Sequence, residues 1–484
     1  MEVDLGHEAA DGGALLGLLA VDGDLGEGPL GLAHEGLEAV DLLLARAGVD
    51  GVEARPGDRE LVEGGVVVEG RLVEARGRDD LLFVEGGHPV DHLAGDAHLV
   101  AGRGDGAAHG ALLLGAGALV GEGEAREYRY SWARQNWFAN SGAEHRALRE
   151  GVGLLDMSSF GKIRVEGPGA LALLQRVCAG QIDVDTGRIV YCQMLNARGG
   201  IECDLTVTRL SETGFLLVVP AATLQRDLAW LRRHLGNDLA IITDVTAAEA
   251  VLCLMGPRAR AVLAACSPAD LSNVAHAFGT AREIELGMGL ARAHRISYVG
   301  ELGWELYVST DQAAHVFEAL VAAGAAEGLK LCGLHAMNSC RMEKAYRSFG
   351  HDISDEDHVL EAGLGFAVAL DKPDFIGRDA VLRKREAGLT RRLVQFLLTD
   401  PGPMLYHNEP ILRDGRIVGV LASGAYGHTL GGSVGLGYVP CAQPGESAAE
   451  TLAAHYEIEV AGRRVAARAS LAPLYDPKAE RPRA

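Results

Sequence analysis

The sequence predicts an α+β fold that ends in a small β-barrel, and three observations from residue 126 onward support it. Residues 201–210 alternate apolar and polar side chains and residues 214–220 run apolar, as strands do. Residues 224–236 and 311–328 place apolar side chains at helical spacing. Residues 413–439 consist of short strand-like runs between glycine-rich turns, which is typical of a barrel.

The length of the chain indicates more than one domain. The chain has 484 residues, of which 48% are hydrophobic, and this is enough for two or three cores. We expect an acidic low-complexity segment at residues 1–125, an α+β domain at residues 126–390 and a barrel domain at residues 391–484.

The composition also predicts where the protein resides. No run of about 18 uncharged apolar residues and no signal-peptide layout is present in the sequence. The eight cysteines lack C-x-x-C spacing, so we interpret them as reduced thiols and expect neither a zinc site nor a disulfide framework. We therefore expect a soluble protein of the cytoplasm, or of the mitochondrial matrix if the source is eukaryotic.

Residues 1–125 have an abnormal composition. They carry −18 of the total net charge of −21, and they contain no Lys, Ser, Thr, Asn, Gln, Ile, Cys, Trp or Tyr. Strands, caps and turns depend on many of these residue types, so we expect an irregular segment that is disordered or non-native, as after a miscalled start. A genuine acidic extension is one alternative. A degenerate nucleotide-binding domain is a second alternative, and only the spacing of Gly115, Gly117 and Gly121 supports it.

A hairpin is expected at residues 190–207, where two strand-like runs flank a glycine-containing turn. Its register places Gln193 opposite Asp204 and Tyr191 opposite Thr206. One face of the hairpin is then lined by polar groups. Spacing alone leaves two interpretations, a solvated strand face or one wall of a site for a heteroaromatic ligand.

A second hairpin is expected at residues 296–308, with a four-residue turn at residues 300–303. This turn would place Tyr298 directly opposite Glu305, so that an aromatic ring and a carboxylate project from the same face. The pair is either an ordinary cross-strand contact or part of a binding site.

The helix-like run at residues 334–353 supplies Arg341, Glu343, His351 and Asp352. Charged side chains at this spacing are typical of a salt-bridged helix followed by a turn. His351 beside Asp352 has no partner spacing that indicates a metal site or a hydrolase triad.

Five ordered motifs together give the sequence a specific family likeness. The chain resembles the folate-dependent aminomethyltransferase of the glycine cleavage system from about residue 143 to residue 475. The motifs lie at residues 153–170, 187–207, 298–308, 340–353 and 360–381. The resemblance implies a three-lobed ring of two α+β domains and a C-terminal β-barrel around a central pocket.

Within that superfamily, the chain is more similar to the folate-binding C-terminal halves of sarcosine and dimethylglycine dehydrogenases. The likeness lies in residues 129–138 and in the strand where Cys203 and Asp204 stand in place of the double Asp usual in the glycine-cleavage enzyme. In such dehydrogenases a flavin domain oxidises an N-methyl amine, and the one-carbon unit passes to tetrahydrofolate. The likeness implies a tetrahydrofolate-binding one-carbon transfer enzyme that forms 5,10-methylenetetrahydrofolate. FAD is not expected on this chain, which has no recognisable flavin half.

The resemblance assigns catalysis to Asp204 and folate contacts to Tyr191, Tyr298, Glu305 and Arg341. An ionised Asp204 beside the folate amine would accept its proton or stabilise developing positive charge. Glu305 would accept the two parallel donors of the amino-pyrimidine edge. This chemistry requires no metal. The partners implied are a folate, a one-carbon donor and a separate flavin-containing subunit, with neither nucleic acid nor membrane.

Three other functions remain open. A stand-alone glycine-cleavage aminomethyltransferase would take an aminomethyl group from a lipoyl carrier protein, but Cys203 and Pro220 depart from its pattern. The related folate-binding protein of iron–sulfur cluster assembly is non-catalytic and carries a K-G-C-Y-type motif, where this chain has EKAYR at residues 343–347. The third is an inactive fragment of a dehydrogenase whose pocket has survived.

Overall fold

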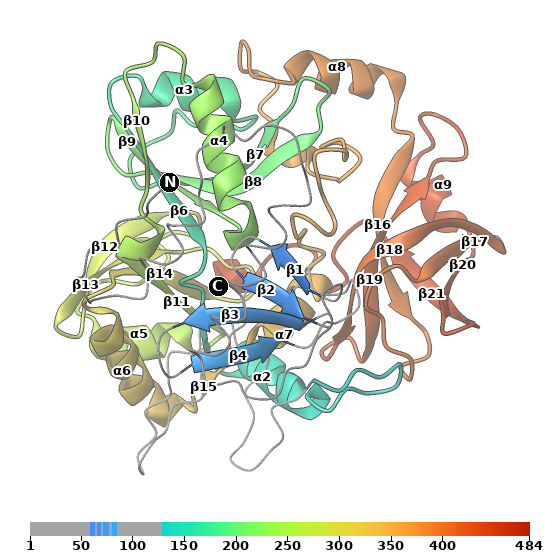
Figure 1. The fold of residues 1–484 in the computed structure, drawn as a ribbon, viewed down its shortest axis with the longest axis horizontal. Helices are drawn as coiled ribbons and strands as arrows, with labels where there is room; N and C mark the ends of the chain where they lie inside the picture. Colours follow the sequence, from blue (N-terminus) through green and yellow to red (C-terminus); the bar gives the residue numbers. More distant parts are fainter. Residues whose placement is uncertain (1–58, 63–64, 69–70, 77–79, 85–127) are drawn as a thin grey trace, which may run out of the picture. The chain divides into compact units, whose positions relative to one another are not determined.

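The computed structural model describes residues 128–484 and four strands of the preceding segment (Figure 1). These strands form an antiparallel sheet in sequence order: β1 (Arg59–Val62), β2 (Gly65–Val68), β3 (Arg71–Arg76) and β4 (Asp80–Val84). A small β-meander is thus present in the segment that the sequence predicts to be irregular. The glycines at 115, 117 and 121 lie outside the described residues.

The first lobe is a five-stranded antiparallel sheet with two helices on one face (Figure 1). The strand order is β10-β6-β9-β8-β7. The elements are β6 (Gly161–Glu166), α3 (Ala170–Val177), β7 (Ile189–Leu195), β8 (Ile201–Arg209), β9 (Gly214–Val219), η3 (Ala221–Thr223), α4 (Leu224–His234) and β10 (Ile241–Asp244).

The β7–β8 hairpin has the predicted register. Gln193 pairs with Asp204 and Tyr191 pairs with Thr206, and a bulge next to the turn absorbs one residue. Alternate side chains of β8, including Cys203, are buried in one cluster with side chains of α3 and α4. Asp204 therefore lies on the opposite face of the sheet, away from these helices.

The second lobe is a six-stranded sheet with the order β12-β13-β14-β11-β5-β15. The helices α5 and α6 share its main apolar cluster. The elements are β5 (Gly153–Asp156), η4 (Thr246–Ala248), β11 (Glu249–Met255), α5 (Ala259–Cys266), β12 (Ala281–Leu286), β13 (Gly289–His294), β14 (Gly303–Ser309), α6 (Ala313–Gly324), η5 (Ala325–Glu327) and β15 (Lys330–Leu331).

The predicted pairing of Tyr298 with Glu305 is wrong. β14 pairs with β13, so His294 stands opposite Glu305, and Tyr298 lies in a loop that follows β13. The backbone amides of Gly300 and Glu301 donate hydrogen bonds to the side chain of Ser297, which folds the loop locally. These local bonds compete with the ladder that a hairpin would need.

The faces of the two sheets that α3 to α6 leave uncovered pack toward each other. One buried cluster contains Leu216 and Val218 of β9 together with Val251, Cys253 and Tyr307 of the second sheet. Because β8 is the neighbour of β9, the face of β8 that carries Asp204 belongs to the same layer. Residues of both sheets thus meet in the space between the first two lobes.

The third lobe is a closed six-stranded barrel with the order β16-β19-β18-β17-β20-β21. Its elements are β16 (Arg391–Leu398), β17 (Pro410–Arg413), β18 (Arg416–Gly427), β19 (Gly432–Pro440), α9 (Ala448–Ala453), β20 (Tyr456–Val460), β21 (Arg463–Ser470) and η7 (Arg481–Arg483). The barrel confirms the expectation for the C-terminal region.

Two helices join the second sheet to the barrel. α2 (Phe138–Glu150) packs on β5 and β15, and α7 (Leu334–Glu343) packs on α2 and on the barrel strands β18 and β19. η6 (Gly365–Ala367) and α8 (Arg378–Ala387) complete the chain before the barrel. The three lobes and the α+β class agree with the predicted fold.

Two further findings concern the chain as a whole. All eight cysteines lie in the described part of the chain and are free thiols. Among the described residues, no helix combines the length and the apolar character that a membrane crossing requires.

Candidate functional site

Asp204 occupies the middle of β8 and has a polar partner on the neighbouring strand. Nε2 of Gln193 donates a 2.8 Å hydrogen bond to Oδ1 of Asp204. Burial raises the pKa of the Asp204 carboxyl to about 6, while hydrogen bonds from Gln193 and Tyr191 oppose this increase. The carboxyl is therefore mostly ionised at pH 7 and titrates close to neutrality.

Tyr191 lies on β7, opposite Thr206 of β8. Its side chain keeps 37% of its surface exposed, yet burial, followed by the charge of Asp204, raises the pKa of its phenol well above the usual value. Protein surrounds the group while solvent still reaches it, which is what a side chain that lines a recess experiences. The ring stacks on Phe366 of η6 with 6.2 Å between centroids.

Tyr298 lies near the same carboxylate, although it is not in a strand. Burial raises the pKa of Tyr298 to about 12, and the charges of Asp352 and Asp204 add to this effect. Its hydroxyl donates a 2.9 Å hydrogen bond to the carbonyl oxygen of Arg347, and its ring stacks on Tyr346 with 6.0 Å between centroids. The structure therefore brings Tyr191, Asp204 and Tyr298 together.

Glu305 projects from β14 into the layer between the two sheets. It is buried, and its only described hydrogen-bond partner is the hydroxyl of Tyr307, which donates to Oε2 at 2.8 Å. Burial raises the pKa of Glu305 to about 7, and the bond from Tyr307 lowers it only in part. A buried carboxyl without a cation is costly, so this position is typical of a functional group.

Arg341 is engaged by the protein itself. Its Nη1 atom donates to Oδ2 of Asp352 at 2.6 Å and to the carbonyl of Tyr346 at 3.1 Å, and Nη2 donates to Oγ of Ser423 at 3.1 Å. The guanidinium thus ties α7 to the segment after it and to the barrel. This geometry favours a role in ordering the site over direct contact with a ligand.

Three polar atoms on the Asp204 face have no partner among the described residues. They are Oε1 of Gln193, whose side chain is fully buried, and the hydroxyl oxygens of Thr206 and Thr208 on β8. Thr206 lies opposite Tyr191 across the hairpin. Buried polar atoms nearly always have a partner in proteins, so unpartnered atoms gathered in one place are typical of a position that water or a ligand fills. The face around Asp204 therefore offers hydrogen-bonding groups that the described residues leave unused.

Four members of this group are absent from the residues that the sequence assigns to the site. The hairpin register could have added Gln193, because the residue directly opposite a carboxylate on the neighbouring strand is its nearest side-chain neighbour. Tyr346, Arg347 and Phe366 come from irregular segments and a short turn, where no periodicity predicts which side chain meets the recess. Only the folded chain brings them beside Tyr298 and Tyr191.

A separate hollow of about 610 Å³ lies in the wall of the barrel. Its polar lining includes His351, Arg391, His407 and Tyr438. None of the five residues predicted to act in catalysis or folate binding lines it. It is therefore distinct from the group around Asp204.

Comparison with known proteins identifies relatives over most of the described chain. Residues 113–372 match the GCVT N-terminal domain, and residues 391–476 match the glycine cleavage T-protein C-terminal barrel domain. The chain is 43% identical over 360 residues to 4-methylaminobutanoate oxidase (formaldehyde-forming) of Paenarthrobacter nicotinovorans, covering 74% of this chain and 43% of that protein.

Other relatives come from two branches. An aminomethyltransferase of Halothermothrix orenii is 37% identical, over 66% of this chain and 89% of that protein. Mitochondrial dimethylglycine dehydrogenase of Rattus norvegicus is 35% identical, over 66% of this chain and 37% of that protein. Among solved structures, aminomethyltransferase T of the Bartonella henselae glycine cleavage system has a TM-score of 0.63 and 26% identity, covering 72% of this chain and 94% of that one.

Proposed function

The chain belongs to the glycine cleavage T-protein family, and we propose that it captures the one-carbon unit of an N-methyl amine on tetrahydrofolate. Aminomethyltransferases of this family use tetrahydrofolate as the one-carbon acceptor. In the proposed reaction, formaldehyde and tetrahydrofolate give 5,10-methylenetetrahydrofolate and water. The folate supplies the two amine nitrogens that bond to the carbon.

One observation carries this proposal. The Asp204 carboxyl, held by Gln193, lies beside the unpartnered acceptors of Gln193 and Thr206 in the layer that also contains Glu305. A nitrogen-rich heterocycle offers the donors that these acceptors lack. The arrangement supports a pterin-like ligand between the sheets.

The role proposed for Asp204 is proton transfer and charge stabilisation. Its pKa of about 6 leaves it ionised at neutral pH, yet close enough to neutrality to accept a proton readily. The hydrogen bond from Gln193 fixes the orientation of the carboxyl in advance. A fixed negative charge near the reacting carbon stabilises positive charge as it develops there.

The role proposed for Glu305 is recognition of the ligand. A carboxylate with one free oxygen and no cationic partner can accept the parallel donors of an amino-pyrimidine edge. The pKa of about 7 means that the ligand must also stabilise the ionised form. Tyr191 and Tyr298 would then contact the ring, and Arg341 would hold the loop behind it in place.

The oxidase and dehydrogenase relatives support an N-methyl amine as the source of carbon. The chain spans 43% of the length of that oxidase and 37% of that dehydrogenase. We infer that a flavin-containing subunit or region performs the oxidation and delivers the carbon to this site. The nature of the amine follows from that part and not from the residues around Asp204.

A second candidate is transfer of an aminomethyl group from a carrier protein. The observation that favours it is the match to nearly the whole length of an aminomethyltransferase. Cys203, which forms a hydrogen bond with Asp227 on the helix-covered face, replaces the first carboxylate of that enzyme's usual pair. This substitution makes aminomethyl transfer the weaker proposal.

One assay separates the two candidates. Purified protein is incubated with tetrahydrofolate and either formaldehyde or an aminomethylated lipoyl carrier protein, and methylene-folate is measured against the uncatalysed rate. Acceleration with formaldehyde alone supports the capture reaction. Ammonia release with the carrier alone would replace it with aminomethyl transfer.

A further inference from the structure

We propose that Arg149 is a positioning residue for the candidate folate site, because it fixes the loop that carries Tyr298. The inference rests on the proposed function, since it assigns Tyr298 a part in folate binding. Arg149 lies in the last turn of α2 and contacts the loop that carries Tyr298.

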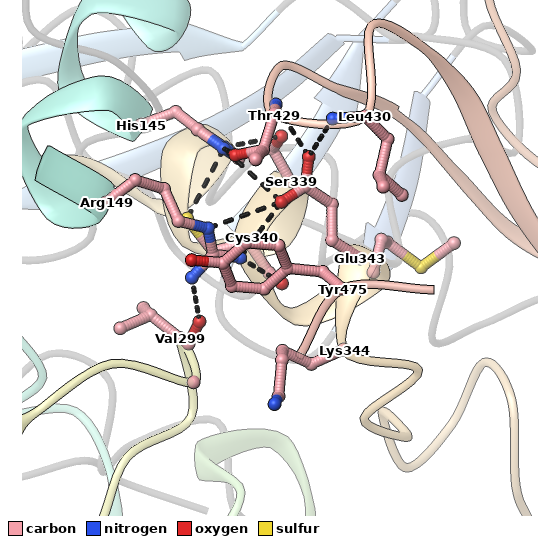
Figure 2. Close-up of polar contacts among 12 residues, drawn as sticks. His145, Arg149, Val299, Ser339, Cys340, Glu343, Lys344, Thr429, Leu430 and Tyr475 are labelled. Atoms are coloured by element: carbon pink, nitrogen blue, oxygen red, sulfur yellow. Dashed lines mark hydrogen bonds and ion pairs between the residues drawn. The ribbon is translucent and has the colours of Figure 1, made fainter. Parts of the chain in front are cut away.

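Arg149 holds the loop directly after Tyr298. Its Nη1 atom donates a hydrogen bond to the carbonyl oxygen of Val299 at 2.6 Å (Figure 2). The same atom donates to Oε1 of Glu301 at 3.1 Å. The side chain of Arg149 is only 3% exposed, so water does not compete for these bonds. One guanidinium nitrogen thus donates hydrogen bonds to two residues of the loop.

The guanidinium of Arg149 is fixed in place because its other nitrogen binds groups of α7, which the barrel holds in turn. Nη2 donates to Oε2 of Glu343 and to the carbonyl of Cys340, both at 3.0 Å. The second oxygen of Glu343 accepts the backbone amides of Thr429 and Leu430 at 2.8 and 3.1 Å. The loop is therefore connected through the buried side chains of Arg149 and Glu343 to α7 and to the β18–β19 turn (Figure 2).

The loop has little freedom to settle elsewhere. Gly300 has a φ of +79°, and a Cβ atom there would lie 2.5 Å from Cγ of Lys344. The loop thus sits directly on the residue that follows α7. Tyr475 adds a second hold, because its hydroxyl donates to Oε1 of Glu301 at 2.7 Å and its ring lies 4.2 Å from the guanidinium of Arg149.

The position of Tyr298 follows from these bonds. It is the residue before Val299, so a shift of the Val299 backbone also moves the Cα atom that carries the phenol ring. The ring itself is held by the hydrogen bond to the carbonyl of Arg347, by a hydrogen bond with the side chain of Ser348 and by stacking on Tyr346. A shift of about 1 Å is enough to spoil a ligand contact of this kind.

A double-mutant cycle on the full chain tests the proposal. Arg149→Lys keeps a positive charge near Glu343 but loses the several N–H donors of the guanidinium. Tyr298→Leu keeps an apolar side chain but removes the phenol ring. The two single variants and the double variant are compared with the parent. Calorimetry measures the Kd for tetrahydrofolate. We expect Arg149→Lys to weaken binding about tenfold in the parent and less than about twofold in Tyr298→Leu, because coupled residues are not additive.

Arg413→Lys is the matched control. Arg413 also binds one backbone carbonyl and one carboxylate, those of Pro440 and Glu446, but in the barrel. Its replacement should leave the Kd unchanged. If Arg149→Lys weakens folate binding equally in the parent and in Tyr298→Leu, the positioning role is overturned. The same holds if Arg413→Lys weakens binding as much as Arg149→Lys does, because Arg149 would then only stabilise the protein in general.

Two further outcomes are decisive. If Arg149→Lys does not fold, Glu301→Gln makes the same test from the loop side, and an additive effect with Tyr298→Leu overturns the proposal. A parent protein without saturable folate binding would instead overturn the proposed function and the positioning role with it.

Discussion

Gln193 and Asp204 face each other across the β7–β8 hairpin and share a 2.8 Å hydrogen bond from amide to carboxylate. The pair lies on the face of the first sheet that looks toward the second lobe. Burial raises the pKa of Asp204 to about 6, so the carboxylate is both ionised and basic at neutral pH. This combination suits a proton acceptor that works near pH 7.

Replacing Asp204 by Asn should strongly slow formaldehyde capture and leave the fold unchanged. The amide preserves the shape of the side chain but can neither accept the proton nor stabilise positive charge. We expect the rate of formaldehyde capture to fall by roughly 10²- to 10⁴-fold. The measurement is methylene-folate formation under saturating folate.

Asp227→Asn is the control for that change. Burial also raises the pKa of Asp227 to about 6, but this residue lies on α4, on the other side of the sheet. Its replacement should leave capture unaffected. An Asp204→Asn protein that retains the parent rate would remove Asp204 from the mechanism.

Glu305→Gln should stabilise the protein at neutral and alkaline pH. The folded pKa of about 7 exceeds the ordinary glutamate pKa of 4.5, so between these values the folded state holds a proton that the unfolded state releases. Stability from this group is therefore full below about pH 4.5 and is lost as pH rises through 7. Thermal melts should show Glu305→Gln a few degrees above the parent at pH 8, with the difference shrinking toward pH 5.

Glu361→Gln should behave in the opposite way. Burial acts to raise the pKa of Glu361, but hydrogen bonds from Lys384, Thr390 and Arg391 outweigh it and hold the pKa at about 2. Removing that charge should lower the melting temperature at pH 8. A Glu305→Gln protein that is also less stable at pH 8 would mean that Glu305 is paired in a way the described contacts do not include.

Folate binding should weaken as pH falls through about 7. Only the ionised form of Glu305 can accept two donors from the ligand, and its pKa lies near 7 in the free protein. Below this pH the Kd should rise, by up to about tenfold per unit for the loss of one ionised group. Calorimetric titrations between pH 5.5 and 8.5 measure this. Affinity that is flat across the range would exclude Glu305 as an acceptor.

Residues 1–125 should contribute nothing to folate binding. Their four described strands pair with one another in a sheet of their own, and their composition lacks many of the residue types that strands, caps and turns use. A protein that begins at Arg126 should bind folate with unchanged affinity and melt at the same temperature or higher. Stoichiometric flavin absorbance in the full chain, or a large drop in melting temperature on truncation, would contradict this expectation.

The sequence predicts the hairpin and not the loop, for a physical reason. Period-two alternation and a glycine turn fix the register of β7 and β8, so the contact of Gln193 with Asp204 follows from local rules. Tyr298 lies outside any strand because Ser297 and Gly300 make a local turn. An apolar-and-glycine pattern does not distinguish such a turn from a hairpin.

Contacts between distant segments are the other part that the sequence does not predict. Arg341 and Asp352 are eleven residues apart and form a 2.6 Å ion pair. Arg149 and Glu343 are in contact although 194 residues separate them along the chain. The charges themselves are visible in the sequence. Their pairing depends on how α2, α7 and the barrel pack, and no spacing rule contains that information.

The most direct test of the account is calorimetry of tetrahydrofolate binding by the full chain and by Glu305→Ala. The account predicts saturable binding at a single site in the parent and a loss of roughly tenfold or more in the variant, because the amino-pyrimidine edge loses its carboxylate partner. Binding that does not saturate, or a Glu305→Ala protein that binds as the parent does, would contradict a folate site between the two sheets.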